Sequence, residues 1–236
     1  MLMHRLSTHP RVHVQMEALA PGYRPKLDLI QKVRRRIPFI EPVADMQLQG
    51  GNLLRFLENT VWGRPAKGRQ AAGFKLLTSQ WARLALDQRK ALLSIKGLKI
   101  IYLEREDILS QCVSHEQARL FGVRHRVANQ PVQELPAIDL TRKTFSEFLK
   151  GLWFQKEFVK SSFSHLPSIE TSYERLLIDP DVENVAILNF LGADPLPLKD
   201  LTARNSYSPL RVRIANYETF AQSLIDTPLE RYLPSK

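Results

Sequence analysis

The clearest change of hydrophobic period in the chain lies between residues 98 and 122. A short apolar run at 98–103 follows a glycine and predicts a strand that is buried on both faces. Beyond it, apolar residues recur at the spacing of one helix face: Leu109, Cys112, Val113 and Leu120. Asp107 is suited to cap this helix and Gly122 to end it. The pattern therefore predicts a strand that leads directly into a helix.

The rest of the pattern predicts further strands and helices. Apolar or alternating runs predict strands at 12–14, 73–77 and 168–172. Helical spacing predicts helices over 1–7, 45–62, 81–92 and 141–163, and a last one that ends near Gly192. The order strand, helix, strand between residues 73 and 103 predicts a parallel sheet with a right-handed crossover, and hence an α/β protein.

Length and charge narrow the class of protein. At 236 residues the chain is long enough for one α/β domain, which we expect to span residues 1–236. Its 34 basic and 24 acidic residues give a net charge of +10, which favours anionic ligands. The basic run KVRRR at 32–36 is better explained as a solvated helix face than as a nucleic-acid patch. We therefore expect no nucleic-acid partner.

The single cysteine and the absence of long apolar runs indicate the compartment. Cys112 has no partner for an internal disulfide, and its place on the apolar helix face predicts a buried thiol. No apolar run approaches the roughly 20 residues of a membrane span. The first residues lack the apolar centre of a signal peptide. We expect a cytoplasmic protein without an integral membrane segment.

Arg105 and Ser114 are candidate ligands of a phosphate group. Arg105 stands where the predicted strand ends and the helix begins, which is where open α/β sheets bind ligands. Ser114 lies two turns into the helix, on the face of Asp107. A guanidinium and a hydroxyl beside the positive end of a helix dipole would suit a phosphate. An arginine at a strand end is also common as a plain surface residue, so both interpretations stand at this point.

The string IIYLEREDILSQCVS, at 100–114, resembles the 3′-phosphate-binding segment of sulfotransferases, in particular the bacterial carbohydrate branch. In that family a strand runs into an arginine, and a helix with Gln-x-Val-Ser follows. The resemblance implies that Arg105 and Ser114 hold the 3′-phosphate of 3′-phosphoadenosine 5′-phosphosulfate. This nucleotide would be the co-substrate that donates the sulfuryl group.

A second segment near the start of the chain resembles the same family. A helix is followed by Leu-x-x-His-Pro and by a glutamate seven residues after the proline, here Leu6, His9, Pro10 and Glu17. In the carbohydrate branch the matching glutamate lies at the acceptor pocket, so the resemblance implies that Glu17 is the catalytic general base. Without the resemblance, Glu17 would be interpreted as a surface carboxylate that follows a strand.

A third segment, at 204–220, resembles the C-terminal cofactor loop and helix of the carbohydrate branch. The resemblance implies that Arg204 and Asn205 contact the nucleotide. Arg211 and Arg213 depart from the pattern, because an acidic or amide residue is common there. The segment YERLL at 173–177 also resembles the family, and we expect Tyr173 and Glu174 to support the sheet without taking part in chemistry.

Together these segments imply a three-layer α/β domain with a parallel central sheet, the P-loop-like sulfotransferase fold. The family's first strand and 5′-phosphosulfate loop have no counterpart, so we expect a truncated chain and a poor catalyst. The implied reaction is transfer of a sulfuryl group to a hydroxyl of a carbohydrate or glycolipid, without a metal. An inactive remnant, or a basic nucleotide-binding protein without catalysis, is the main alternative. A nucleotide kinase would need a complete phosphate loop and magnesium ligands, which the sequence does not show.

Overall fold

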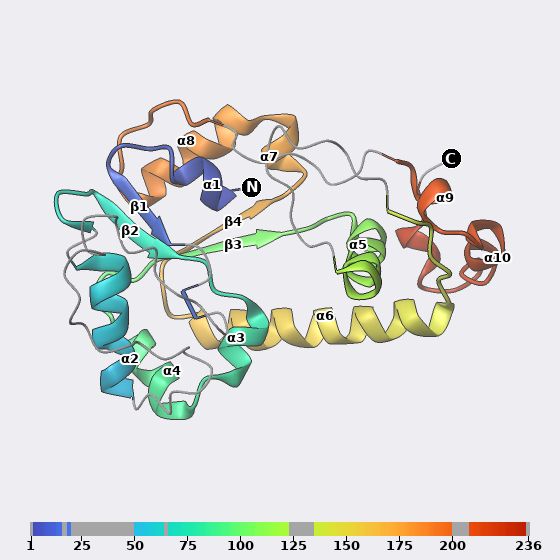
Figure 1. The fold of residues 1–236 in the computed structure, drawn as a ribbon, viewed down its shortest axis with the longest axis horizontal. Helices are drawn as coiled ribbons and strands as arrows, with labels where there is room; N and C mark the ends of the chain where they lie inside the picture. The colour runs from blue at the N-terminus through green and yellow to red at the C-terminus, as the bar shows by residue number, and fades with distance from the viewer. Residues whose placement is uncertain are drawn as a thin grey trace, which may run out of the picture.

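A computed structural model of the protein describes residues 2–15, 18–19, 50–63, 66–122, 135–199 and 208–234. It combines helices with parallel strands, which confirms the predicted α/β class (Figure 1). In chain order the elements are α1 (Leu2–Leu6), β1 (Val12–Gln15), α2 (Gly50–Leu57), the π-helix η2 (Glu58–Trp62), β2 (Ala71–Phe74), α3 (Thr78–Arg83), α4 (Leu86–Leu93), β3 (Ile100–Glu104), α5 (Ile108–Phe121), α6 (Arg142–Phe163), β4 (Ser168–Ser172), α7 (Arg175–Ile178), α8 (Pro180–Leu191), α9 (Leu210–Arg213), α10 (Tyr217–Gln222) and the 3-10 helix η4 (Glu230–Tyr232).

The described strands form two parallel pairs. β1 pairs with β2, with Val12 opposite Ala71, and β3 pairs with β4, with Ile100 opposite Ser168. Both pairs are parallel, as predicted, but the expected sheet that joins the strands at 73–77 and 98–103 is not found among the described residues, and β2 begins two residues earlier than expected. β2 and β3 lie in different sheets, because β2 pairs with the strand that precedes it and β3 with the strand that follows α6. The connection through α3 and α4 therefore passes from one sheet to the other.

Two hydrophobic clusters cover the faces of these strands. The first joins α1 and α8 to Val14 of β1 and Ile101 of β3. The second joins α2, α3, α4 and one end of α6 to Phe74 of β2 and Tyr102 of β3. Both sheets contribute to both clusters, so the two sheets lie between the same helical layers (Figure 1).

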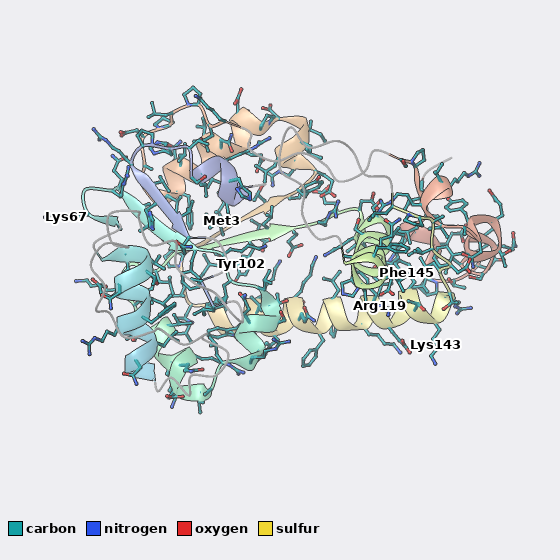
Figure 2. The ribbon with its side chains drawn as sticks, viewed as in Figure 1. Met3, Lys67, Tyr102, Arg119, Lys143 and Phe145 are labelled. Carbon is teal, nitrogen blue, oxygen red and sulfur yellow. The ribbon has the colours of Figure 1, made fainter. Side chains whose placement is uncertain are left out.

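The helix α6 extends from the strands to a third hydrophobic cluster (Figure 1). It has 22 residues and is capped by Thr141, whose hydroxyl oxygen accepts the backbone N–H of Thr144 at 3.1 Å. Phe145, labelled in Figure 2, is fully buried where α6 meets α5. Across the described ranges, no helix is both long and apolar enough to traverse a membrane.

Residues 208–234, called here the C-terminal segment, pack against α5 and α6 through the third cluster. The buried residues that the segment contributes are Ile214, Phe220 and Leu224. Its path is fixed by an isolated parallel bridge between Ile138 and Ile214. The side-chain amide of Asn216 also hydrogen-bonds both backbone groups of Leu140, at 3.0 Å each. These contacts bring the C-terminal segment to α5, almost a hundred residues earlier in the chain.

The apolar face predicted for α5 is confirmed for three of its four residues, since Leu109, Cys112 and Val113 are fully buried. Leu120 is 53% exposed, so the prediction was wrong there. In the last two turns the buried position belongs to Gln117, which is only 2% exposed because its amide finds hydrogen bonds inside the protein. β3 is not buried on both faces either, because the cluster of α1 and α8 reaches Ile101 and leaves Leu103 45% exposed.

The single helix predicted over 81–92 is two helices. The chain is extended at Leu84 and Ala85, with ψ angles of 138° and 161°, which separates α3 from α4. Each new helix start is capped by a glutamine, since Gln80 and Gln88 accept the N–H groups of Leu77 and Ala85 at 2.9 and 2.8 Å. The Gln88 bond satisfies the Ala85 amide at the break between the two helices.

Candidate anion-binding site

Arg105 is positioned by the end of β3. The strand pairing continues one residue past β4, where the N–H of Tyr173 donates to the carbonyl of Glu104 at 2.8 Å. The Arg105 guanidinium lies over the Tyr173 ring, 4.4 Å from its centroid. Arg105 Nε is 4.0 Å from Glu174 Oε1, which is too long for a hydrogen bond. In the described part of the chain this buried Nε has no hydrogen-bond partner, while the Arg105 side chain as a whole is 29% exposed.

The first backbone amides of the β3–α5 turn are occupied by carboxylates of the chain itself. Glu174 accepts the N–H of Glu106 at 2.9 Å and that of Asp107 at 3.4 Å. Asp107 in turn accepts the N–H of Ser110 at 2.9 Å, which is the cap predicted for α5. Glu174 thus supports the turn, as we expected from the sequence. An anion at this place would depend on side chains more than on the amides of the helix start.

We expect Asp107→Ala to lower the free energy of unfolding by about 1 kcal/mol, because α5 loses its cap and the Ser110 N–H loses its acceptor. Urea unfolding at neutral pH measures the loss. Asp107→Asn is the matched control, since it removes the same charge and keeps an oxygen that can accept the N–H. A loss of equal size in both variants would show that the charge of Asp107, and not its cap, stabilises α5.

Ser114 is joined to an arginine that the sequence did not single out as a ligand. The Ser114 hydroxyl donates to the carbonyl of Ser110 at 2.8 Å, which leaves its oxygen free to accept. Arg213 Nη2, at the end of α9, donates to Ser114 Oγ at 2.9 Å. Nη2 and Nε of Arg213 also donate to Gln117 Oε1, at 2.9 and 3.3 Å. The C-terminal segment therefore places a second guanidinium against the serine predicted to bind phosphate.

The two guanidinium groups lie close enough to repel each other. Burial lowers the pKa of Arg213, and the positive charge of Arg105 lowers it further, while the charge of Asp107 acts in the opposite direction. No carboxylate of the described residues lies within ion-pair distance of Arg213. Glu174 lies 4.0 Å from Arg105 and the charge of Asp107 acts on Arg213, but neither carboxylate hydrogen-bonds a guanidinium. Two loosely compensated cations and a hydroxyl are suited to bind an anion.

A weak signal for this site was present in the sequence. Gln111, Ser114 and Gln117 recur every three residues on α5, which predicts a polar stripe beside the apolar face. Gln111 Oε1 is buried, and within the described ranges it has no hydrogen-bond partner. Nothing local pointed to Arg213, because its place beside Ser114 depends on how the C-terminal segment packs. The structure thus places Ser114 against an arginine that sequence reasoning missed, and the charge of Arg105 acts on the same arginine.

The other predicted site residues are Glu17, Arg204 and Asn205, and all three lie outside the residues that the structure describes. Gln80 of α3 is 6% exposed and caps that helix, so it has a structural role.

A second charged cluster lies at the same strand end but is electrically balanced. Lys156 and Lys160 of α6 contact Glu104 of β3 at 2.8 and 3.2 Å, and Lys160 also contacts Glu170 of β4 at 2.9 Å. Burial alone would raise the pKa of Glu104, but hydrogen bonds and charges from the two lysines bring it below its usual value. Two cations face two carboxylates, so this cluster ties α6 to the strands and offers no unmatched charge to a ligand.

Cys112 is not a candidate for covalent chemistry, because burial raises the pKa of its thiol to about 12. In the ranges the structure describes, no three His, Cys, Asp or Glu side chains gather as a metal site would require. Among the described residues of this region, Arg105, Arg213 and Ser114 are the candidates to bind an anion.

Comparison with known proteins adds no assignment to this site. No protein-family model matches the chain, and no curated protein matches it.

Proposed function

We propose that Arg105 and Ser114 bind the 3′-phosphate of a nucleotide and that the protein is a sulfotransferase. The donor is 3′-phosphoadenosine 5′-phosphosulfate, and the acceptor is a hydroxyl of a carbohydrate or glycolipid. The observation that carries the proposal is a strand-end arginine with an unpartnered Nε, next to a helix serine that a second guanidinium contacts. Two guanidinium groups and a hydroxyl favour a multiply charged ligand such as a phosphate.

The arrangement of the strands supports a fold of the sulfotransferase type. β1–β2 and β3–β4 are both parallel, and both lie between the same two hydrophobic clusters. We infer that they belong to one three-layer domain. In that domain Arg105 would lie at the carboxyl end of β3, the usual position of ligands in open parallel sheets.

Sulfuryl transfer leaves little covalent work for the protein. The acceptor oxygen forms a bond to sulfur while the bond between sulfur and the 5′-phosphate oxygen breaks, and adenosine 3′,5′-bisphosphate leaves. In our proposal Glu17 takes the proton of the acceptor hydroxyl, and Arg204 and Asn205 contact the nucleotide. Arg105 holds the 3′-phosphate so that donor and acceptor stay in line. The proposed reaction needs no metal ion.

We expect Arg105→Ala to weaken the binding of adenosine 3′,5′-bisphosphate by about 10- to 150-fold. The reason is that a charge-assisted hydrogen bond contributes about 1.5–3 kcal/mol. Isothermal titration calorimetry measures the change. Adenosine 5′-monophosphate, which lacks the 3′-phosphate, should bind the parent protein weakly and should be insensitive to Arg105→Ala.

The matched control is Arg119→Ala. Arg119 lies on the same helix α5, is labelled in Figure 2, and its side chain is 61% exposed in an ion pair with Glu116. Its removal should leave nucleotide affinity unchanged. Equal affinity of parent and Arg105→Ala would remove the nucleotide site. Tight, Arg105-dependent binding without any transfer from the sulfuryl donor would favour the alternative of a nucleotide-binding protein without catalysis.

A further inference from the structure

Arg213 is the residue of this site that neither the sequence nor the resemblance assigned. It comes from the C-terminal segment and reaches Ser114 and Gln117 of α5, which lie 99 and 96 residues earlier in the chain. Its neighbour Ile214 forms the bridge to Ile138 and is 1% exposed, so the backbone that carries Arg213 is anchored. The position of the guanidinium therefore results from tertiary packing and not from a chance surface contact.

The partners of Arg213 satisfy its hydrogen bonds without neutralising its charge. Ser114 and Gln117 are both uncharged acceptors, and in the described ranges no ion pair of Arg213 is present. Arg211, two residues earlier, differs in each respect: its side chain is 72% exposed and lies 3.6 Å from the carboxylate of Glu218. A partly buried cation without an ion-pair partner is costly, and a bound anion would reduce that cost.

Several donors of the two arginines remain available to a ligand. Arg213 uses Nε and Nη2 for Gln117 and Ser114, and its Nη1 makes no hydrogen bond to any described residue. The Arg105 side chain is 29% exposed, and its buried Nε has no hydrogen-bond partner among the described residues. The Ser114 hydroxyl can rotate its proton from the Ser110 carbonyl to a ligand oxygen. A phosphate has enough oxygens to accept from all three side chains at once.

We propose that Arg213 is a direct ligand of the same phosphate as Arg105 and Ser114, so that the C-terminal segment forms one wall of the binding site. This inference rests on the proposed nucleotide site and adds a second guanidinium to it. Because the anion would contact α5 and the C-terminal segment together, its binding stabilises the packing of that segment. The ligand class is a phosphate dianion, either free or as the 3′-phosphate of a nucleotide.

The test compares the parent with Arg213→Gln and with the control Arg211→Gln. Glutamine at 213 keeps an amide that can bond Ser114 and Gln117 while it removes the charge. We expect Arg213→Gln to weaken both adenosine 3′,5′-bisphosphate and inorganic phosphate by about tenfold or more in calorimetry. Arg211→Gln should bind both probes within about twofold of the parent. Circular dichroism and the melting temperature without ligand show whether each variant is folded.

A second measurement distinguishes a role of Arg213 in phosphate binding from a purely structural role. Hydrogen exchange of the amides at 208–234 should slow when adenosine 3′,5′-bisphosphate is added to the parent, and should respond much less in Arg213→Gln. If Arg213→Gln lowers the melting temperature but binds both probes like the parent, Arg213 has only a structural role and the inference is wrong. If nucleotide does not bind but phosphate binds and depends on Arg213, the inference holds and the proposed function fails.

Discussion

Phe145→Ala is expected to lower the free energy of unfolding by about 3–5 kcal/mol, the usual cost of truncating a buried phenylalanine. Phe145 is completely buried and meets two aromatic rings of the C-terminal segment edge to face. Its ring centroid lies 6.1 Å from that of Phe220 and 5.6 Å from that of Tyr232. The substitution thus opens a cavity and also removes two aromatic contacts between α6 and the segment that carries Arg213. Chemical denaturation monitored by circular dichroism measures the loss.

Phe154→Ala is the matched control on the same helix. The Phe154 side chain is 68% exposed, so its removal should change the free energy of unfolding by about 0.5 kcal/mol or less. Similar losses in the two variants would contradict the assignment of the third cluster as a well-packed core.

Glu17→Gln is expected to lower the turnover of sulfuryl transfer by about 10²- to 10⁴-fold, the usual contribution of a general base. Glutamine keeps the size and hydrogen bonding of the side chain but cannot take the proton of the acceptor hydroxyl. Turnover is measured at saturating donor and acceptor, with the parent protein and the variant under the same conditions.

The binding of adenosine 3′,5′-bisphosphate serves as the control for Glu17→Gln. Its affinity should equal that of the parent, because our proposal gives Glu17 no contact with the 3′-phosphate. Full turnover in Glu17→Gln would eliminate the base role. Loss of nucleotide affinity in this variant would place Glu17 at the donor and not at the acceptor.

Helix ends were predicted most accurately, because their signals are local. α5 begins after Asp107 and ends before Gly122, whose φ of 72° suits a residue without a side chain. α8 likewise ends before Gly192, as predicted, and its start is capped by Asp179. In each case one side-chain oxygen or one glycine determines the boundary, so neighbouring residues suffice to find it.

The pairing of strands and the exposure of single residues were predicted less well. The apolar run around β3 indicated a strand, but only packing decides that β3 pairs with β4 while β2 pairs with β1. Leu103 and Leu120 are apolar and fit the predicted faces, yet both are largely exposed, because the clusters do not extend to them. Hydrophobic character alone does not tell how far a neighbouring layer reaches.

Two of the three residues of the candidate site could be proposed from the sequence. Arg105 and Ser114 belong to one strand and helix, so their sequence spacing sets their relation. Arg213 comes from a distant segment, and its contact with Ser114 depends on the bridge between Ile138 and Ile214 and on the third cluster. A tertiary contact of this kind leaves no pattern in the sequence around it.

A crystal structure of the protein with adenosine 3′,5′-bisphosphate tests the central claim most directly. Our account predicts the 3′-phosphate at the end of β3, with its oxygens about 2.7–2.9 Å from guanidinium nitrogens of Arg105 and Arg213, and within hydrogen-bond distance of the Ser114 hydroxyl. A nucleotide bound with its 3′-phosphate away from these three side chains would contradict the account.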